Sequence, residues 1–236
     1  PNARDSVYFS TWGSGVFKVN TEDGSVTQRY TAENSTLMDI LGGSAYTRNA
    51  AIAYDMDGNL HVCQAEVDAA IAIKGADGQW YSCSYPGLTK FHSTRMMLIS
   101  SNNNAYVCKT DMTLNPGIFV YNTNGTIEDD SDDMYRGKNV YDDDRDMGEI
   151  HLWDEDGEII SDYINDIIED KNNVLWFATN HGIATFTGDK DVFTTERPVF
   201  RRIKVPRNDG TNNADYLLDG VRINALAVDG ANRKWI

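Results

Sequence analysis

Residues 164–186 constrain the fold more than any other stretch, because three short apolar runs follow one another there with turns between them. The runs occupy residues 167–168, 175–178 and 183–186, and Gly182 stands directly before the last of them. Short apolar runs joined by tight polar turns are typical of antiparallel β-strands. The stretch therefore predicts a three-stranded meander.

The same unit recurs along the chain: an Asp or Ser stands six residues before a ring-bearing side chain, and an apolar run precedes the pair. The copies are Asp55/His61, Ser100/Tyr106, Asp170/Trp176 and Asp229/Trp235, and a further copy centred on Tyr8 is incomplete. Repeats of about 40 to 50 residues with four strands each are the sequence signature of propeller blades. We therefore expect an all-β protein, a β-propeller of four-stranded antiparallel blades with about four to five blades present.

The repeat divides a single propeller domain, residues 1–236, into approximate units at 1–48, 49–92, 93–127, 128–161, 162–219 and 220–236. The fourth holds an acidic insertion and a hairpin. In the fifth, residues 192–195 are expected as a strand and residues 208–215 as a polar loop. The last copy stops inside its second strand. Because a propeller closes by pairing strands from both chain ends in one blade, we expect a fragment of a longer protein, incomplete at its C-terminus.

Composition argues against two classes of partner. The chain has 21 Lys and Arg against 36 Asp and Glu, which gives a net charge of −15. Nucleic acids and anionic membranes attract cationic surfaces, so neither is expected to bind. No apolar run approaches the roughly 18 residues needed to cross a bilayer, so no transmembrane segment is expected in this chain.

The three cysteines, Cys63, Cys83 and Cys108, are too few and too odd in number for a disulfide framework. Cys63 and Cys108 each stand two residues after the ring position of neighbouring units. We expect both to be small buried residues that face an adjacent blade. A disulfide between them is the alternative, but packed sheets lie about 10 Å apart, which is too far for most disulfides.

One region is markedly acidic, with runs at residues 128–133 and 142–146. Carboxylates at this density can bind Ca²⁺, but the runs lack the spacing of a calcium loop with its bidentate Glu, so a solvated loop is the favoured interpretation. The Asp-x-Asp-Gly sequences at 55–58 and 154–157 are interpreted as turns. The four histidines show no metal-ligand spacing, and His61 is expected in the core. No cofactor or metal site is expected, with calcium at the acidic loop as the alternative.

Propeller geometry indicates where a ligand would bind. The loops that join second to third strands should emerge on one side of the disc, near the central channel; they are residues 11–14, 64–68, 110–116 and 179–181. Trp12 and His181 have the side chains best suited to stack on a sugar or close on a peptide. Asn180 is also free to touch a ligand. Trp12, Asn180 and His181 are therefore the predicted ligand-binding residues, and the alternative is that they are ordinary loop residues.

Two segments carry a family resemblance. Residues 164–170, leading to residues 175–183, resemble the two-component-regulator propeller repeat, which builds the periplasmic sensor halves of hybrid two-component regulators. Residues 221–236 look like the corresponding stretch of the PorZ-type propeller proteins of type IX secretion, and residues 12–17 and 34–37 fit the same family. The other repeats depart from the pattern, because His61 and Tyr106 stand where Trp is usual and Ser100 stands where Asp is usual.

The resemblance implies a protein of two propellers and a β-sandwich, located at the outer membrane or cell surface. Members of the family act with the sortase-like machinery that attaches anionic lipopolysaccharide to secreted cargo. The sandwich has no counterpart in these 236 residues. Any function that resides in the sandwich therefore cannot be carried by this chain.

No sequence fingerprint of catalysis is present: neither a nucleophile elbow, nor a P-loop, nor a dinucleotide-binding sequence. We therefore expect a protein that is not an enzyme, and an exported one of the periplasm or the outer-membrane surface. The first hypothesis is a non-catalytic binding or scaffolding module whose partners are proteins of a secretion assembly or a glycan or lipopolysaccharide. The alternative is the periplasmic glycan-sensing ectodomain of a hybrid two-component regulator. A propeller glycan lyase or hydrolase would require carboxylates, His or Tyr clustered around the channel.

Overall fold

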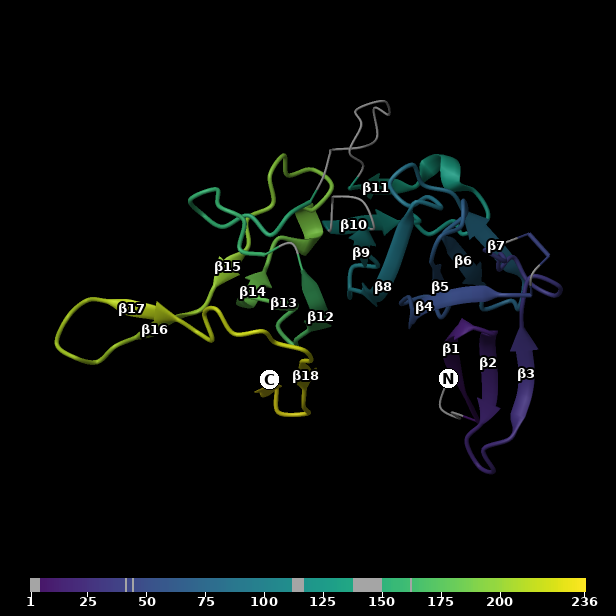
Figure 1. The fold of residues 1–236 in the computed structure, drawn as a ribbon, viewed down its shortest axis with the longest axis horizontal. Helices are drawn as coiled ribbons and strands as arrows, with labels where there is room; N and C mark the ends of the chain where they lie inside the picture. The colour runs from purple at the N-terminus through teal and green to yellow at the C-terminus, as the bar shows by residue number, and fades with distance from the viewer. Residues whose placement is uncertain (1–4, 41, 44, 112–116, 138–149, 162) are drawn as a thin grey trace.

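The computed structural model describes residues 5–40, 42–43, 45–111, 117–137, 150–161 and 163–236. In these residues the fold is antiparallel β-sheet with two short 3₁₀ turns, as the repeat predicts. The sheets follow one another in an arc, with both chain ends on its lower side (Figure 1). The predicted all-β propeller architecture is confirmed. None of the helices in the described ranges is long and apolar enough to cross a membrane.

The strands alternate with short turns throughout the described chain. In order they are β1 (Ser6–Gly13), β2 (Gly15–Asn20), β3 (Val26–Tyr30), β4 (Thr47–Tyr54), β5 (Leu60–Gln64), β6 (Ile71–Lys74), β7 (Trp80–Cys83), β8 (His92–Ile99), β9 (Ala105–Asp111), β10 (Gly117–Asn122), β11 (Met134–Arg136), β12 (Ile164–Glu169), β13 (Leu175–Thr179), β14 (Gly182–Phe186), β15 (Arg201–Arg202), β16 (Lys204–Pro206), β17 (Ala214–Tyr216), β18 (Ala227–Val228) and β19 (Lys234–Trp235). The 3₁₀ turns are η1 (Asp130–Asp132) and η2 (Asp189–Asp191).

Neighbouring strands in sequence pair with each other, as expected of blades. The sheets run β3-β2-β1-β4-β5-β6-β7, β11-β10-β9-β8 and β12-β13-β14-β15, with the pairs β16-β17 and β18-β19 beside them. The first sheet joins two groups of strands through a short contact, in which Trp12 and Gly13 of β1 pair with Arg48 and Thr47 of β4. The division of the chain into units stays a prediction.

In the copies that begin with Asp, this residue closes the turn that follows it. One carboxylate oxygen, Oδ1, accepts the backbone N–H groups two and four residues later, at 3.0 and 2.7 Å for Asp55, 2.8 and 3.1 Å for Asp170, and 2.9 and 3.0 Å for Asp229. Asp154 closes its turn in the same way. This is the behaviour of a short polar side chain that bonds its own backbone, so the two Asp-x-Asp-Gly sequences are turns, as interpreted.

The core lies between successive sheets. Three apolar clusters lie between successive strand groups, which are β1–β3, β4–β7, β8–β11 and β12–β15. A fourth cluster lies between β12–β15 and the segment around Ile223 and Leu226. All three cysteines are free and buried in this core, which confirms the expectation for Cys63 and Cys108. Burial raises the pKa of the Cys63 thiol to about 12, so it stays protonated and packs as a small apolar group.

One prediction on the fifth unit is wrong, and another holds except at its C-terminal end. Residues 192–195 form a turn and no strand, because Val192 is buried and Arg136 of β11 donates to the carbonyls of Val192 and Thr195 at 2.6 and 2.7 Å. Those carbonyls are therefore not available to a sheet. Residues 208–213 form the expected loop, whereas residues 214–215 belong to β17, which pairs with β16 in a hairpin that projects from the body at the left of Figure 1.

Candidate functional site

Trp12 lies at the end of β1, so the expected loop at residues 11–14 is largely strand. Its ring is 48% exposed. Gly13 follows with φ +151°, a conformation that disfavours other residues, and a Cβ there would collide with the ring of Tyr46. The glycine therefore allows the backbone of β1 to approach the ring of Tyr46 closely.

Arg48 ties these rings together. Its guanidinium carbon lies 5.4 Å from the Trp12 ring centroid and 5.3 Å from that of Tyr46, and its Nη1 meets Oε2 of Glu66 at 2.5 Å. Glu66 adopts φ +61°, which is uncommon for a residue with a side chain. We call Trp12, Tyr46, Arg48 and Glu66 the Trp12 cluster. It unites the predicted loops at 11–14 and 64–68 in one place, with both rings still reaching solvent.

A second group of the same kind lies along the chain from the Trp12 cluster. Lys90 sits 5.7 Å from the Phe91 ring centroid and 3.9 Å from a carboxylate oxygen of Asp68. Phe91 is 70% exposed, and Asp68 belongs to the same β5–β6 loop as Glu66. Tyr46 and Phe91 each stand three residues before a matching bulge, at Asn49 and Thr94, so they occupy equivalent positions directly before β4 and β8.

The other two predicted residues lie in the β13–β14 turn, on a different sheet. Asn180 accepts a hydrogen bond from Nδ2 of Asn165 at 3.0 Å, and its own backbone N–H donates to the carbonyl of Tyr163. His181 is exposed, and its side chain has no hydrogen-bond partner within the described ranges. No contact in that part of the chain links either residue to the Trp12 cluster. The structure thus leaves His181 accessible and gives Asn180 a structural contact.

Tyr46, Arg48 and Glu66 were missed by sequence reasoning, because nothing local links them to Trp12. Tyr46 and Arg48 directly flank the start of β4, and a ring and a cation two residues apart at a strand's start could have been noticed. Glu66 carried no signal, because its role depends on a left-handed backbone that the sequence does not reveal.

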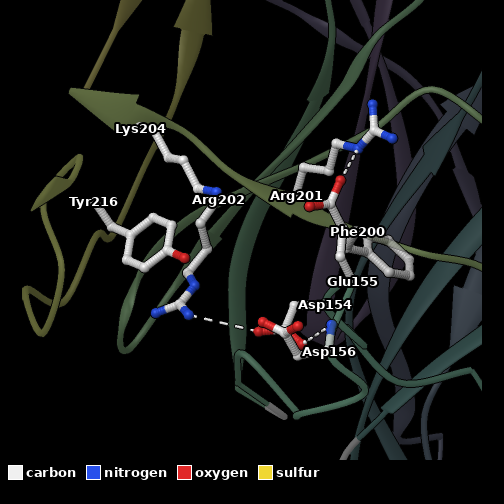
Figure 2. Close-up of a pocket in the computed structure, with 8 residues that line it drawn as sticks. All are labelled: Asp154, Glu155, Asp156, Phe200, Arg201, Arg202, Lys204 and Tyr216. Atoms are coloured by element: carbon white, nitrogen blue, oxygen red, sulfur yellow. Dashed lines mark hydrogen bonds and ion pairs between the residues drawn. The ribbon is translucent and has the colours of Figure 1, made fainter. Parts of the chain in front are cut away.

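A separate pocket of about 380 Å³ lies where the β16–β17 hairpin joins the body. We call it the Arg202 pocket. Figure 2 shows Lys204, Tyr216 and Arg202 on one side and the acidic turn on the other. Its lining residues are Asp154, Glu155, Asp156, Phe200, Arg201, Arg202, Lys204 and Tyr216. The sequence marks the turn at 154–157, and the fold brings the basic residues Arg201, Arg202 and Lys204 against it.

Ion pairs cross this pocket. Arg202 stacks on Tyr216, 3.7 Å from the ring centroid, and reaches Asp154 at 3.5 Å and Asp219 at 3.6 Å. Arg201 pairs with Glu155 at 2.9 Å. The pKa of Asp154 is lowered, first by the backbone hydrogen bond from Glu158, so this carboxylate stays ionised at neutral pH.

The remaining candidates have structural roles. His61 is 3% exposed, with Nδ1 at 2.7 Å from the hydroxyl of Tyr121 and Nε2 at 3.2 Å from Asp55, which confirms the prediction of a core residue. In the acidic region, η1 is capped by Asp129, whereas the run at 142–146 lies outside the described residues. Within the described ranges, no three His, Cys, Asp or Glu side chains gather in a way that could hold a metal ion.

The repeat has a counterpart among known sequence families. Residues 153–181 match the two component regulator propeller family. That match includes the first two strands of the best-preserved copy, with Asp170 and Trp176 in its C-terminal half. No curated protein matches the sequence.

Solved structures extend the likeness to the whole chain. PorZ, described as an essential bacterial surface component of the type-IX secretion system of Porphyromonas gingivalis, matches with a TM-score of 0.83 and 25% identity over 100% of this chain. Two extracellular domains from B. thetaiotaomicron, of proteins described as hybrid and one component systems, match with TM-scores of 0.51 and 0.56 at 17% and 12% identity. The two matches cover 99% and 98% of this chain, and each covers 25% of the other protein's chain.

These matches confirm the predicted resemblance to regulator propellers and to PorZ. The two extracellular domains are too distant in sequence to show more than a common fold. This chain spans 30% of the length of the PorZ chain. The activity of a complete protein of that kind therefore enters only as a proposal.

Proposed function

We propose that this propeller is a non-catalytic binding or scaffolding module of an exported surface assembly, and that the Trp12 cluster is its principal binding surface. The observation that carries the proposal is the pair of half-exposed rings, Trp12 and Tyr46, held in place by one guanidinium that Glu66 neutralises. Rigid aromatic side chains bind a partner with little loss of conformational entropy, and they are enriched in binding hot spots.

The similarity to PorZ supports a surface assembly of a secretion system as the setting. PorZ is described as a surface component of a secretion system, and it shares 25% identity with this chain over a match that covers all of this chain and 30% of PorZ. We propose the same setting for this protein: export to the periplasm or outer-membrane surface, with protein partners of a secretion assembly or a lipopolysaccharide ligand. The net charge of −15 favours the protein partners over the lipopolysaccharide, because an acidic surface repels an anionic ligand.

Partner capture with a matched control tests the proposal. The wild-type chain and Trp12→Ala, displayed at the surface of a type IX-secreting cell, are cross-linked and the bound components identified. Trp12→Ala should lose the cross-linked partner, whereas Trp235→Ala, which removes a Trp that is 58% exposed on another sheet, should retain it. Equal capture by all three proteins would contradict the proposal.

The match of residues 153–181 to the regulator propeller family favours one alternative, a glycan-sensing ectodomain. In that case His181 and Asn180, at the end of the matched stretch, would contact the glycan. Direct titration of oligosaccharides decides between the two functions. Saturable binding that His181→Ala abolishes and Trp12→Ala leaves intact would support the sensor and not the surface assembly.

A further inference from the structure

The Arg202 pocket has the dimensions of a small-molecule site. Its volume of about 380 Å³ falls within the range of about 300 to 1,000 Å³ that such sites occupy. Its two walls come from segments some 45 residues apart, the turn at 154–156 and the strand region at 200–204, which the backbone hydrogen bond from Phe200 N–H to the Trp153 carbonyl holds together at 2.7 Å.

One side chain on each wall is held in place by contacts within the protein. On the acidic wall, Oδ1 of Asp154 accepts the backbone N–H groups of Asp156 and Glu158 at 3.0 and 2.9 Å. On the basic wall, the ring of Tyr216 supports the guanidinium of Arg202 at 3.7 Å. Side chains that need not reorganise lose less entropy on binding, so such a pocket is preorganised for a charged ligand.

The ion pairs in the pocket leave binding capacity on both walls. Arg202 meets Asp154 and Asp219 at 3.5 and 3.6 Å, longer than the roughly 2.7 to 2.9 Å of a charge-assisted hydrogen bond, so its donors remain available. Lys204 and Asp156 are both exposed, and neither forms an ion pair with any residue that the structure describes. One wall therefore offers an ammonium and a guanidinium, and the other offers a carboxylate.

We propose that the Arg202 pocket binds a small zwitterion of the amino acid or dipeptide class. The ligand carboxylate lies against Arg202 and Lys204, and the ligand ammonium lies against Asp156. A simple anion meets three acidic residues on the opposite wall, and a simple cation meets three basic ones, so each is disfavoured by like-charge repulsion. A ligand that carries both charges at opposite ends satisfies both walls.

Calorimetric titration of this chain with the twenty free L-amino acids and the Ala-Xaa dipeptides tests the proposal. At least one probe should bind saturably. Its N-acetylated and C-amidated forms should each bind at least tenfold more weakly, because each loses the charge that one wall recognises. Absence of binding by every probe overturns the proposal, and so does equal binding of the blocked forms.

Two variants locate the site. Asp156→Asn and Lys204→Met should each weaken the bound probe by tenfold or more, while Lys190→Met, which removes an exposed lysine from another turn, should leave it unchanged. Lys204 and Asp156 are exposed, so both variants should unfold at the wild-type denaturant concentration. Wild-type affinity in both variants would show that the probe binds elsewhere and would overturn the assignment.

Discussion

Two copies of the repeat, residues 55–61 and 170–176, share the same contact between an Asp and a ring but differ in how they contact the next sheet. In each copy, Oδ1 of the Asp closes the turn and Oδ2 contacts the ring nitrogen six residues later, His61 Nε2 at 3.2 Å and Trp176 Nε1 at 3.1 Å. In the first copy the other nitrogen of His61 meets the hydroxyl of Tyr121. In the second, Lys234 of β19 pairs with Asp170 at 2.6 Å.

The difference shows which part of the unit is constrained. The first position needs a short side chain that accepts the N–H groups of its own turn, Asp in these two copies and Ser100 in another. The ring position is more variable, because His and Trp both place a ring nitrogen near Oδ2. Burial acts to raise the pKa of both Asp55 and Asp170, but hydrogen bonds outweigh it, chiefly from His61 in the first and from Lys234 in the second, and both pKa values end below the ordinary value. The first copy therefore reaches the next sheet through His61 and the Tyr121 hydroxyl, and the second reaches it through the ammonium of Lys234.

The largest effect is expected from Asp170→Ala. The change opens the turn, leaves Trp176 without its acceptor and leaves the ammonium of Lys234 half-buried without its counterion. Loss of one partner of a largely buried ion pair costs about 3 kcal/mol of unfolding free energy. Urea unfolding followed by tryptophan fluorescence measures it.

Asp229→Ala is the matched control for Asp170→Ala. Asp229 closes an equivalent turn and bonds Trp235, but it lies at the surface. This variant should lose about 1 kcal/mol or less, because water replaces the missing acceptor. Equal losses in the two variants would mean that the lysine contact contributes nothing.

His61→Phe should have the next largest effect. The phenyl ring fills the same core space, but Asp55 Oδ2 and the Tyr121 hydroxyl both lose a partner at a site that is 3% exposed. Unsatisfied buried polar groups cost about 1 to 3 kcal/mol each, although Asn59 still donates to Asp55, so we expect about 2 kcal/mol in total. The double variant His61→Phe/Tyr121→Phe should recover part of that loss, and failure to recover any would place the cost in packing.

The sequence predicted the turn and its ring contact, but not the residues of the next sheet that contact them. The spacing of six residues identified Asp170 and Trp176 as turn and packing anchors, because both interactions are local and depend on one turn geometry. Tyr121 and Lys234 lie about 60 residues from the groups they contact, and a single sequence contains no signal for pairs at that range. The Trp12 cluster is the same case: Trp12 was predicted, whereas its partners depend on how β1 meets β4.

Acid should separate the wild type from Asp170→Asn, which keeps an acceptor for the turn but removes the charge. The folded-state pKa of Asp170 is below its ordinary value of 3.8, so its contribution is fully present above about pH 4 and is lost as the pH falls through the folded-state pKa. Near pH 7 the variant should be about 1 to 2 kcal/mol less stable than the wild type. That difference should shrink steadily below pH 4, and a constant difference would exclude a role for the charge.

The smallest effects concern hydrogen bonds between neighbouring turns. Asn103 accepts the backbone N–H of Met56 at 2.8 Å, and Asn232 accepts that of Lys171 at 3.0 Å, the equivalent contact two sheets further on. Both asparagines have φ near +60°, where glycine fits without strain, so Asn→Gly removes little more than the side-chain bonds, which for Asn103 include a second one, from Nδ2 to Asp57 at 3.1 Å.

Each of Asn103→Gly and Asn232→Gly should therefore cost about 0.5 to 1 kcal/mol in urea unfolding. Asn173→Gly is the control: Asn173 has φ +59° in its turn, but at that sheet contact Glu169 accepts the N–H of Ser101 instead, at 2.7 Å. Asn173→Gly should then be close to neutral. A loss in Asn173→Gly as large as in the other two would show that the asparagines act through backbone conformation, and that the turns of successive sheets are not coupled by their side chains.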